Sequence, residues 1–117
     1  MTLDSGDRIF FDVTPTHMAL QAVSVENLGD DDSGCDTVVL HGRDVALLLY
    51  RLTTANADGC VTAGVPGSSM LRTQTTYDDL GKVTVLLETD RNVIHMKAYE
   101  RDMLVSAVES RSWRLFQ

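Results

Sequence analysis

The sequence predicts an α+β domain in which a mostly antiparallel β-sheet carries one clear amphipathic helix. Three observations support this fold class. The chain has 117 residues, 44% of them hydrophobic, which is enough for one hydrophobic core. Apolar residues recur with helical spacing near residues 43–56. The C-terminal half contains three β-rich runs that begin ten to twelve residues apart, which is typical of an antiparallel meander.

Three β-rich runs precede the helix. Residues 8–13 form the first, and Thr14-Pro15-Thr16 ends it, because proline fixes φ and cannot continue a hydrogen-bonded ladder. Residues 18–26 favour a second strand, since valine prefers extended backbone. Residues 36–40 are predicted to be a buried strand, because they end in an uninterrupted apolar run, Val38-Val39-Leu40.

The helix is predicted over residues 43–56. Its apolar residues follow the i, i+3, i+4, i+7 pattern of a core-facing helix: Val45, Leu48, Leu49 and Leu52. Asp44 lies in the first turn, where negative charge complements the helix dipole. Asp58-Gly59 supplies a stop signal.

A short strand at 60–65 and then the meander strands 70–77, 82–89 and 92–99 are predicted after the helix. The run 70–77 is polar and therefore reads as an edge strand or an arm. In the last two strands the apolar residues alternate, which puts one group on the core side: Val83, Val85, Leu87, Ile94, Met96 and Ala98. His95 and Lys97 are expected on the opposite face.

A second helix near 100–110 is favoured over a strand at 103–108. Its apolar positions have helical spacing: Tyr99, Met103, Leu104, Ala107 and Val108. The tail at 113–116 contains two aromatic residues, so it is expected to dock on the core or on a second subunit.

The chain is predicted to be one globular domain, 1–117, with two similar halves, about 1–58 and 59–117, as the alternative. Arg43-Asp44 and Arg101-Asp102 each precede an apolar run and are 58 residues apart. In that alternative each half would be roughly three strands and a helix. This topology is similar to that of whirly-type single-stranded nucleic-acid binders, and the resemblance implies a nucleic-acid function as an alternative.

The acidic residues are concentrated in the first half of the chain. The chain carries 17 acidic and 10 basic residues, a net charge of −7. Residues 1–58 hold ten acidic and three basic residues, whereas residues 59–117 hold seven of each, so the whole excess precedes Gly59. Five acidic residues fall within one segment of eleven: Glu26, Asp30, Asp31, Asp32 and Asp36.

Three interpretations of this acidic segment stay open. Gly29 and Gly34 fit a solvated loop, because Gly, Asp and Ser are loop residues. Asp30, Asp32 and Asp36 could bind calcium, although the twelfth position of such a loop, normally acidic, is histidine here. The third interpretation is a recognition surface for a basic protein partner, which clustered charge attracts. The predicted partner-binding residues are therefore the five acids named above.

The sequence favours no metal, cofactor or catalytic role. Cys35 and Cys60 form no disulfide framework and indicate a reducing compartment. The three histidines lack the short spacing of zinc ligands. The glycine-rich run 64–69 lacks the lysine of a phosphate-binding loop. Neither a signal peptide nor a membrane span is expected, so the predicted location is the cytoplasm.

These patterns lead to one main functional hypothesis, a small acidic, non-catalytic, inhibitor-type module that binds a basic protein. In size and charge it is similar to immunity proteins and phage anti-defence proteins, and a homodimer is expected. One alternative is a single-stranded nucleic-acid binder that uses basic and aromatic residues of the second half: Arg72, Lys82, Arg91, Lys97, Arg101, Arg111, Arg114, Tyr77, Tyr99, Trp113 and Phe116. The other alternative is a small enzyme with its site at a dimer interface.

Overall fold

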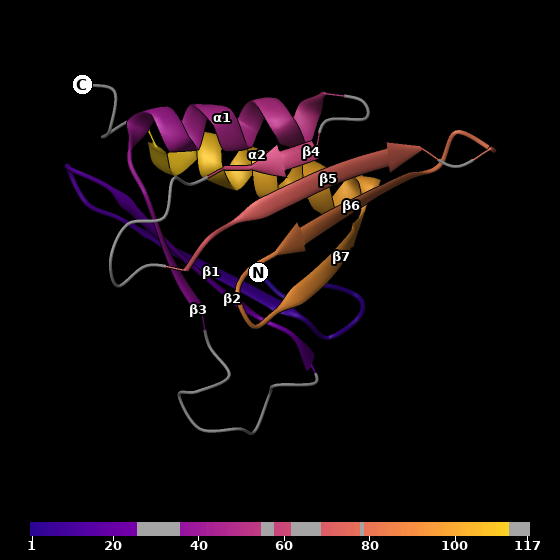
Figure 1. The fold of residues 1–117 in the computed structure, drawn as a ribbon, viewed down its shortest axis with the longest axis horizontal. Coiled ribbons are helices and arrows are strands. Elements are labelled where there is room, and N and C mark those ends of the chain that lie inside the picture. Colours follow the sequence, from indigo (N-terminus) through magenta and orange to yellow (C-terminus); the bar gives the residue numbers. More distant parts are fainter. Residues whose placement is uncertain (26–35, 55–57, 62–68, 78, 113–117) are drawn as a thin grey trace.

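The computed structural model describes residues 1–25, 36–54, 58–61, 69–77 and 79–112 (Figure 1). The elements follow in the order β1 (Arg8–Val13), β2 (Met18–Val23), β3 (Asp36–Leu40), α1 (Gly42–Thr53), β4 (Asp58–Cys60), β5 (Arg72–Tyr77), β6 (Val83–Glu88), β7 (Val93–Lys97) and α2 (Ala98–Ser112). The predicted α+β class, the C-terminal meander and both predicted helices are confirmed.

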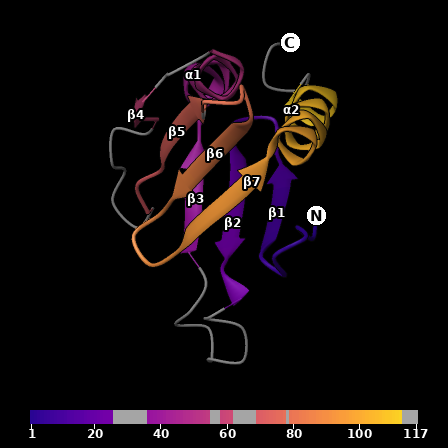
Figure 2. The same ribbon diagram turned by 90° about the vertical axis from the view of Figure 1, so that its right-hand side faces the viewer.

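The strands form two antiparallel sheets. One has the order β1-β2-β3 and the other the order β4-β5-β6-β7. Figure 2 shows the second sheet in front of the first, with the strands of the two sheets crossing. The helices α1 and α2 lie side by side across one end of the two sheets. No helix among the described residues has the length and apolar character needed to cross a membrane.

The inner faces of both sheets and one side of each helix share one hydrophobic core. Because side chains alternate along a strand, every second residue points into it. The fully buried strand residues include Ile9, Met18, Leu20, Val38, Leu40, Val85, Leu87 and Ile94. The helices add Val45, Leu48, Leu52, Leu104 and Val108. Four of the predicted inward positions of the meander are therefore confirmed as buried: Val85, Leu87, Ile94 and Met96. Val83 is only partly buried, and Ala98 belongs to α2 and not to the last strand. His95 and Lys97 are exposed on the opposite face as expected.

Two boundaries around α1 and β4 differ from the prediction. The helix ends at Thr53, before residue 56, and the next strand is Asp58–Cys60 and not 60–65. Gly59, predicted to stop the helix, lies within this strand and pairs with Thr73. It has φ +147°, and a Cβ there would lie 2.9 Å from a guanidinium nitrogen of Arg51. Glycine therefore lets β4 run close to the end of α1.

The polar strand β5 is not an edge strand over its first residues. It lies between β4, which pairs with Arg72–Gln74, and β6. Two of its threonines, Thr73 and Thr75, face inward and are fully buried. The Thr75 hydroxyl donates a hydrogen bond to the Arg51 carbonyl (3.1 Å), which satisfies this buried polar group.

The face of α2 that enters the core also differs from the prediction. Tyr99 and Met103, expected on the core side, are 49% and 56% exposed. Leu104 and Val108 are buried as predicted, and Glu100 and Ser112 are buried with them. Glu100 is tolerated there because its carboxylate accepts hydrogen bonds from two backbone amides, those of Asp4 (2.9 Å) and Lys97 (3.0 Å).

Candidate functional site

The five acidic residues predicted to bind a partner belong to the connection between β2 and β3 and to the start of β3. Glu26, Asp30, Asp31 and Asp32 lie outside the described residues. Asp36 is the first residue of β3, and its backbone pairs with β2. The structure therefore describes the two ends of this connection, after β2 and at the start of β3.

The connection between β2 and β3 is long for its place in the fold. It spans twelve residues, 24–35, between the end of β2 and the start of β3. The connection between β6 and β7 joins two neighbouring antiparallel strands in the same way with four residues, 89–92. There the Thr89 amide donates to the Asn92 carbonyl (2.8 Å), which closes a tight turn. The fold thus requires only a short turn between such strands.

Two hydrogen bonds fix the point where the acidic connection leaves the sheet. The Val25 amide donates to Oδ1 of Asp7 (2.7 Å), and the Ser24 amide donates to Oδ1 of Asn92 (2.8 Å). Both acceptor residues are buried. Because Asn92 belongs to the β6–β7 turn, the acidic connection begins directly beside that turn.

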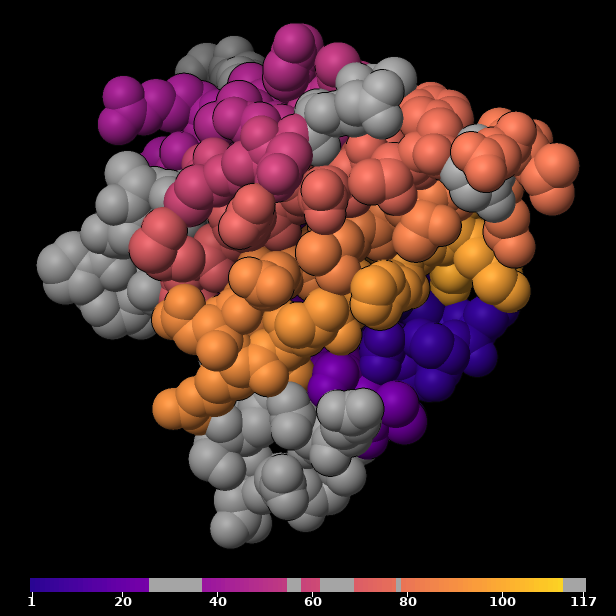
Figure 3. Space-filling view, turned by 45° about the vertical axis from the view of Figure 1, so that its right-hand side comes forward, coloured from indigo at the N-terminus to yellow at the C-terminus, as the bar shows by residue number. Residues whose placement is uncertain are grey.

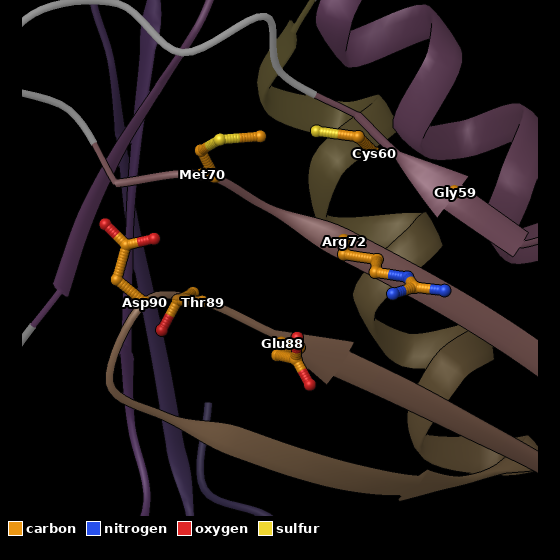
Figure 4. A pocket seen from close by; sticks show the side chains of 7 residues that line it. All are labelled: Gly59, Cys60, Met70, Arg72, Glu88, Thr89 and Asp90. Carbon is orange, nitrogen blue, oxygen red and sulfur yellow. The ribbon is translucent and has the colours of Figure 1, made fainter.

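The same turn borders a hollow on the outer face of the second sheet, which we call the β6-end hollow (Figure 4). Its volume is about 340 Å³, and it is lined by Gly59, Cys60, Met70, Arg72, Glu88, Thr89 and Asp90. The sulfur-bearing side chains of Cys60 and Met70 lie along one side, while Glu88 and Asp90 come from the end of β6 and the turn that follows.

The charge balance of the β6-end hollow is negative. Arg72 donates from Nε and Nη2 to the two carboxylate oxygens of Asp58, at 3.2 and 3.1 Å. This hydrogen bonding to Asp58, followed by the charges of Asp58 and Glu88, raises the pKa of Arg72. Asp58 thus matches the charge of Arg72. Glu88 and Asp90 have no ion-pair partner within the described part of the chain. The turn that carries Asp90 also accepts the Ser24 amide, through the side chain of Asn92.

A second hollow lies at the other end of the same sheet, and we call it the β7-end hollow. Its volume is about 370 Å³, and it is lined by Asp4, Ser5, Lys82, Val83, Thr84, His95, Met96, Lys97 and Glu100. Nζ of Lys97 lies 3.2 Å from Oδ2 of Asp4, and the Tyr99 hydroxyl donates to the same oxygen. The bonds from Tyr99 and then Lys97 lower the pKa of Asp4, and the bond to Asp4 raises the pKa of Tyr99 to about 12.

The arginines considered for nucleic-acid binding contact groups of this chain. Arg101 bonds to the carboxylate of Asp102 (3.1 Å). Arg111 lies over the ring of Phe11, with Cζ 4.9 Å from its centroid, and donates to the Phe11 carbonyl (3.4 Å). Trp113, Arg114 and Phe116, named for the same role, lie outside the described residues.

The His, Cys, Asp and Glu side chains bear on metal binding, and the two cysteines on disulfide formation. Over the ranges that the structure describes, no three side chains of the His, Cys, Asp and Glu types come together as a metal site would require. The Cys60 side chain is exposed at the β6-end hollow, whereas Cys35 lies outside the described residues. Comparison of the chain with protein-family models, curated proteins and solved structures finds no match.

Sequence reasoning missed the residues that extend the acidic site. Asp7 and Asn92, which hold the base of the connection, and Glu88 and Asp90, which line the hollow, are separated from it by many residues. Hydrogen bonds between residues far apart in sequence, including one from Ser24 to Asn92 of the other sheet, bring the base of the connection to this turn. The dipeptide Asp90-Arg91 predicted the turn between β6 and β7. It carried no information on which distant residues this turn contacts.

Proposed function

We propose that this protein is a small acidic, inhibitor-type module that binds the basic surface of a protein partner. Its binding residues are Glu26, Asp30, Asp31, Asp32 and Asp36. The observation that carries the proposal is the twelve-residue connection, where the equivalent place in the second half closes with four. Most connections between neighbouring strands are much shorter, and long ones are often functional.

The charge of this connection supports the proposal. Like charges held close together repel each other and cost folding free energy, so five acids in eleven residues are not explained by stability. Complementary potentials raise the association rate of oppositely charged proteins. Glu88 and Asp90 extend the acidic surface, because the β6–β7 turn lies at the base of the connection.

The test is a triple variant, Asp30→Asn, Asp31→Asn and Asp32→Asn. Partners are captured with the wild-type protein, and association of the variant with the purified partner is then followed at low and high salt. We expect a melting temperature that is unchanged or slightly higher. The association rate constant should fall several-fold at low salt and less at high salt, since salt screens these charges.

A matched control changes the net charge by the same amount at exposed positions elsewhere, Asp12→Asn, Asp102→Asn and Glu109→Gln. Its association rate should stay within about twofold of the wild type, because these charges lie far from the proposed surface. Equal losses in both variants would mean that only the net charge matters. Loss of stability together with loss of calcium binding in the triple variant would replace the proposal with a cation site.

The finer features of the hypothesis are proposed with it. The module acts in the cytoplasm, where an exposed thiol such as Cys60 stays reduced. It forms a homodimer, and sedimentation of the purified protein tests this directly.

Single-stranded nucleic-acid binding is a second candidate, and the observation that favours it is topology. Three antiparallel strands followed by a helix occur in each half, in β1-β2-β3-α1 and in β5-β6-β7-α2. This order is similar to that of whirly-type binders. Fluorescence anisotropy with a labelled oligothymidine tests it. A nucleic-acid binder would show affinity that falls steeply with salt, whereas the proposed acidic module would show none at any salt concentration.

A further inference from the structure

We propose that residues 114–116 of this chain bind as an antiparallel strand along the free edge of β1, in the position that β4 holds beside β5. These residues come just after α2 and lie outside the described residues. The proposal gives the first sheet a fourth strand, so that it matches the four-stranded second sheet. It is independent of the proposed basic partner, because it rests on the likeness of the two halves of the chain.

Phe11 of β1 and Thr73 of β5 occupy equivalent positions in the two halves. Phe11 lies opposite Leu20 of β2, and Thr73 lies opposite Leu87 of β6. Each leucine is fully buried and lies opposite a fully buried residue of the next strand, which leads into a helix. The strand that pairs with Thr73 in the second half therefore indicates what can pair with Phe11 in the first.

That strand is β4, which follows α1 and closes the edge of β5. Gly59 of β4 lies opposite Thr73. Figure 3 shows the residues of β4 (pink) beside those of β5 (coral) on the surface of the molecule. The equivalent buried leucines of the two helices, Leu48 and Leu104, are 56 positions apart. With the same offset, β4 (Asp58–Cys60) corresponds to residues 114–116, which follow α2 as β4 follows α1.

The matching edge of β1 is open beyond Ile9. The Met1 amino group donates to the Ile9 carbonyl (2.8 Å), and the Ile9 amide donates to the Met1 carbonyl (2.9 Å). Because the backbone groups of every second residue face the same edge of an antiparallel strand, those of Phe11 face this edge too. Nη1 of Arg111 donates to the Phe11 carbonyl (3.4 Å), so the end of α2 lies at this edge. The hydrogen bonds of the described residues leave the Phe11 amide without an acceptor there.

The side chains of 114–116 suit this position. The register of β4 and β5, transferred to β1, gives three pairs: Arg114 opposite Asp12, Leu115 opposite Phe11 and Phe116 opposite Phe10. Asp12 and Phe10 are exposed on the outer face, where opposite charges and aromatic rings stabilise neighbouring strands. Phe10 also lines a hollow of about 340 Å³ that a second ring can enter. In the second half an ion pair, Arg72 to Asp58 (3.1 Å), already joins the equivalent strands.

Hydrogen exchange of the Phe11 amide tests the pairing. In the proposed strand this amide donates to the Leu115 carbonyl, and the Leu115 amide donates to the Phe11 carbonyl. Leu115→Pro removes that second donor, so the Phe11 amide should exchange at least about tenfold faster in the variant than in the wild type. The Ile9 amide serves as the control within the same sample. It is bonded to Met1, so its exchange rate should not change.

A charge exchange tests the register. Asp12→Arg should speed exchange of the Phe11 amide, because two arginines then face each other, and adding Arg114→Asp should restore slow exchange. An unprotected Phe11 amide in the wild type, or equal protection in Leu115→Pro, would overturn the proposal. Protection that grows with protein concentration would assign this edge to a second copy of the chain and would overturn it as well.

Discussion

The strands and helix of the first half, β1-β2-β3-α1, have counterparts in β5-β6-β7-α2 of the second. Buried residues recur 56 positions apart along β3 and β7 and along the two helices: Val38 and Ile94, Leu40 and Met96, Leu48 and Leu104, Leu52 and Val108. The preceding strands pair with them in the same way, since Leu20 lies opposite Val38 and Leu87 lies opposite Ile94. That these units arose by duplication stays a prediction.

The repeated Arg-Asp dipeptides do not mark equivalent positions in the two halves. Asp44 is the third residue of α1, whereas Asp102 is the fifth of α2. The residue equivalent to Asp44 is Glu100. Asp44 accepts a hydrogen bond from the His41 amide (3.2 Å), and Glu100 accepts one from the Lys97 amide (3.0 Å). Both are capping-box bonds, in which the third helical side chain binds the amide before the helix.

The two halves differ in the connection before the last strand and in the contacts of the capping carboxylate. In the first half the connection before the last strand is long and acidic, and in the second it is a tight turn. In the second half the capping carboxylate of Glu100 also holds the Asp4 amide of the N-terminal segment, whereas Asp44 binds its own helix alone among the described residues. The same arrangement of three strands and a helix thus carries a long acidic connection in one half and, in the other, a carboxylate that holds the N-terminal segment.

The largest effect is expected from the equivalent core leucines. Leu48→Ala and Leu104→Ala should each lower the free energy of unfolding by about 2–5 kcal/mol, because each leaves a cavity in the shared core. Leu48→Asp should unfold the chain, since an unpaired buried charge costs several kcal/mol. Urea denaturation followed by circular dichroism measures this, with Ala46→Asp on the exposed side of α1 as the control. Two separate transitions would show that the halves fold independently.

The two capping carboxylates should differ in their contribution to stability. Glu100→Ala removes the acceptor of two backbone amides at a residue only 4% exposed, so we expect a loss of about 1–3 kcal/mol. Asp44→Ala removes one bond at a more accessible position and should cost less than about 1 kcal/mol. Hydrogen exchange should also show faster exchange of the Asp4 amide in the Glu100 variant. Similar losses in both variants would contradict the docking role of Glu100.

Shortening the acidic connection should have a small effect on stability. Replacing 26–35 with Asn-Gly leaves four residues between β2 and β3, the length of the turn at 89–92. The free energy of unfolding should stay within about 1 kcal/mol of the wild type, because loop-closure entropy changes slowly with length. Thermal denaturation measures it, and binding to the captured partner should be lost. A variant that fails to fold would show that the connection is structural.

The smallest effect concerns the hydrogen bond between Tyr99 and Asp4. The bond raises the pKa of Tyr99 from 10.0 to about 12, so the neutral phenol contributes to stability below pH 10 and this contribution is lost as pH rises through 12. The pKa of Asp4 is lowered from 3.8, so its contribution is present above that pH and lost as pH falls below it. In Asp4→Asn the ultraviolet titration of Tyr99, assigned with Tyr99→Phe, should move toward pH 10.

Much of the fold was readable from short stretches of sequence. The strands Arg8–Val13 and Asp36–Leu40 occur where they were predicted, and the helix near 43–56 starts one residue early and ends three residues early. Alternation along β6 and β7 correctly gave the buried face. These features depend on the spacing of apolar residues, which is local to each element. The charge excess before Gly59 is likewise a property of the sequence alone.

Other features were decided by contacts between distant residues. Burial of Glu100 in place of Tyr99 depends on the Asp4 amide, 96 residues away, which satisfies the carboxylate. The position of β4 depends on the close approach of Arg51 to Gly59. The start of the acidic connection meets the β6–β7 turn through the bond between Ser24 and Asn92, 68 residues apart. A local pattern carries no information on such partners, because hydrogen-bond satisfaction of a buried polar group is a property of the assembled fold.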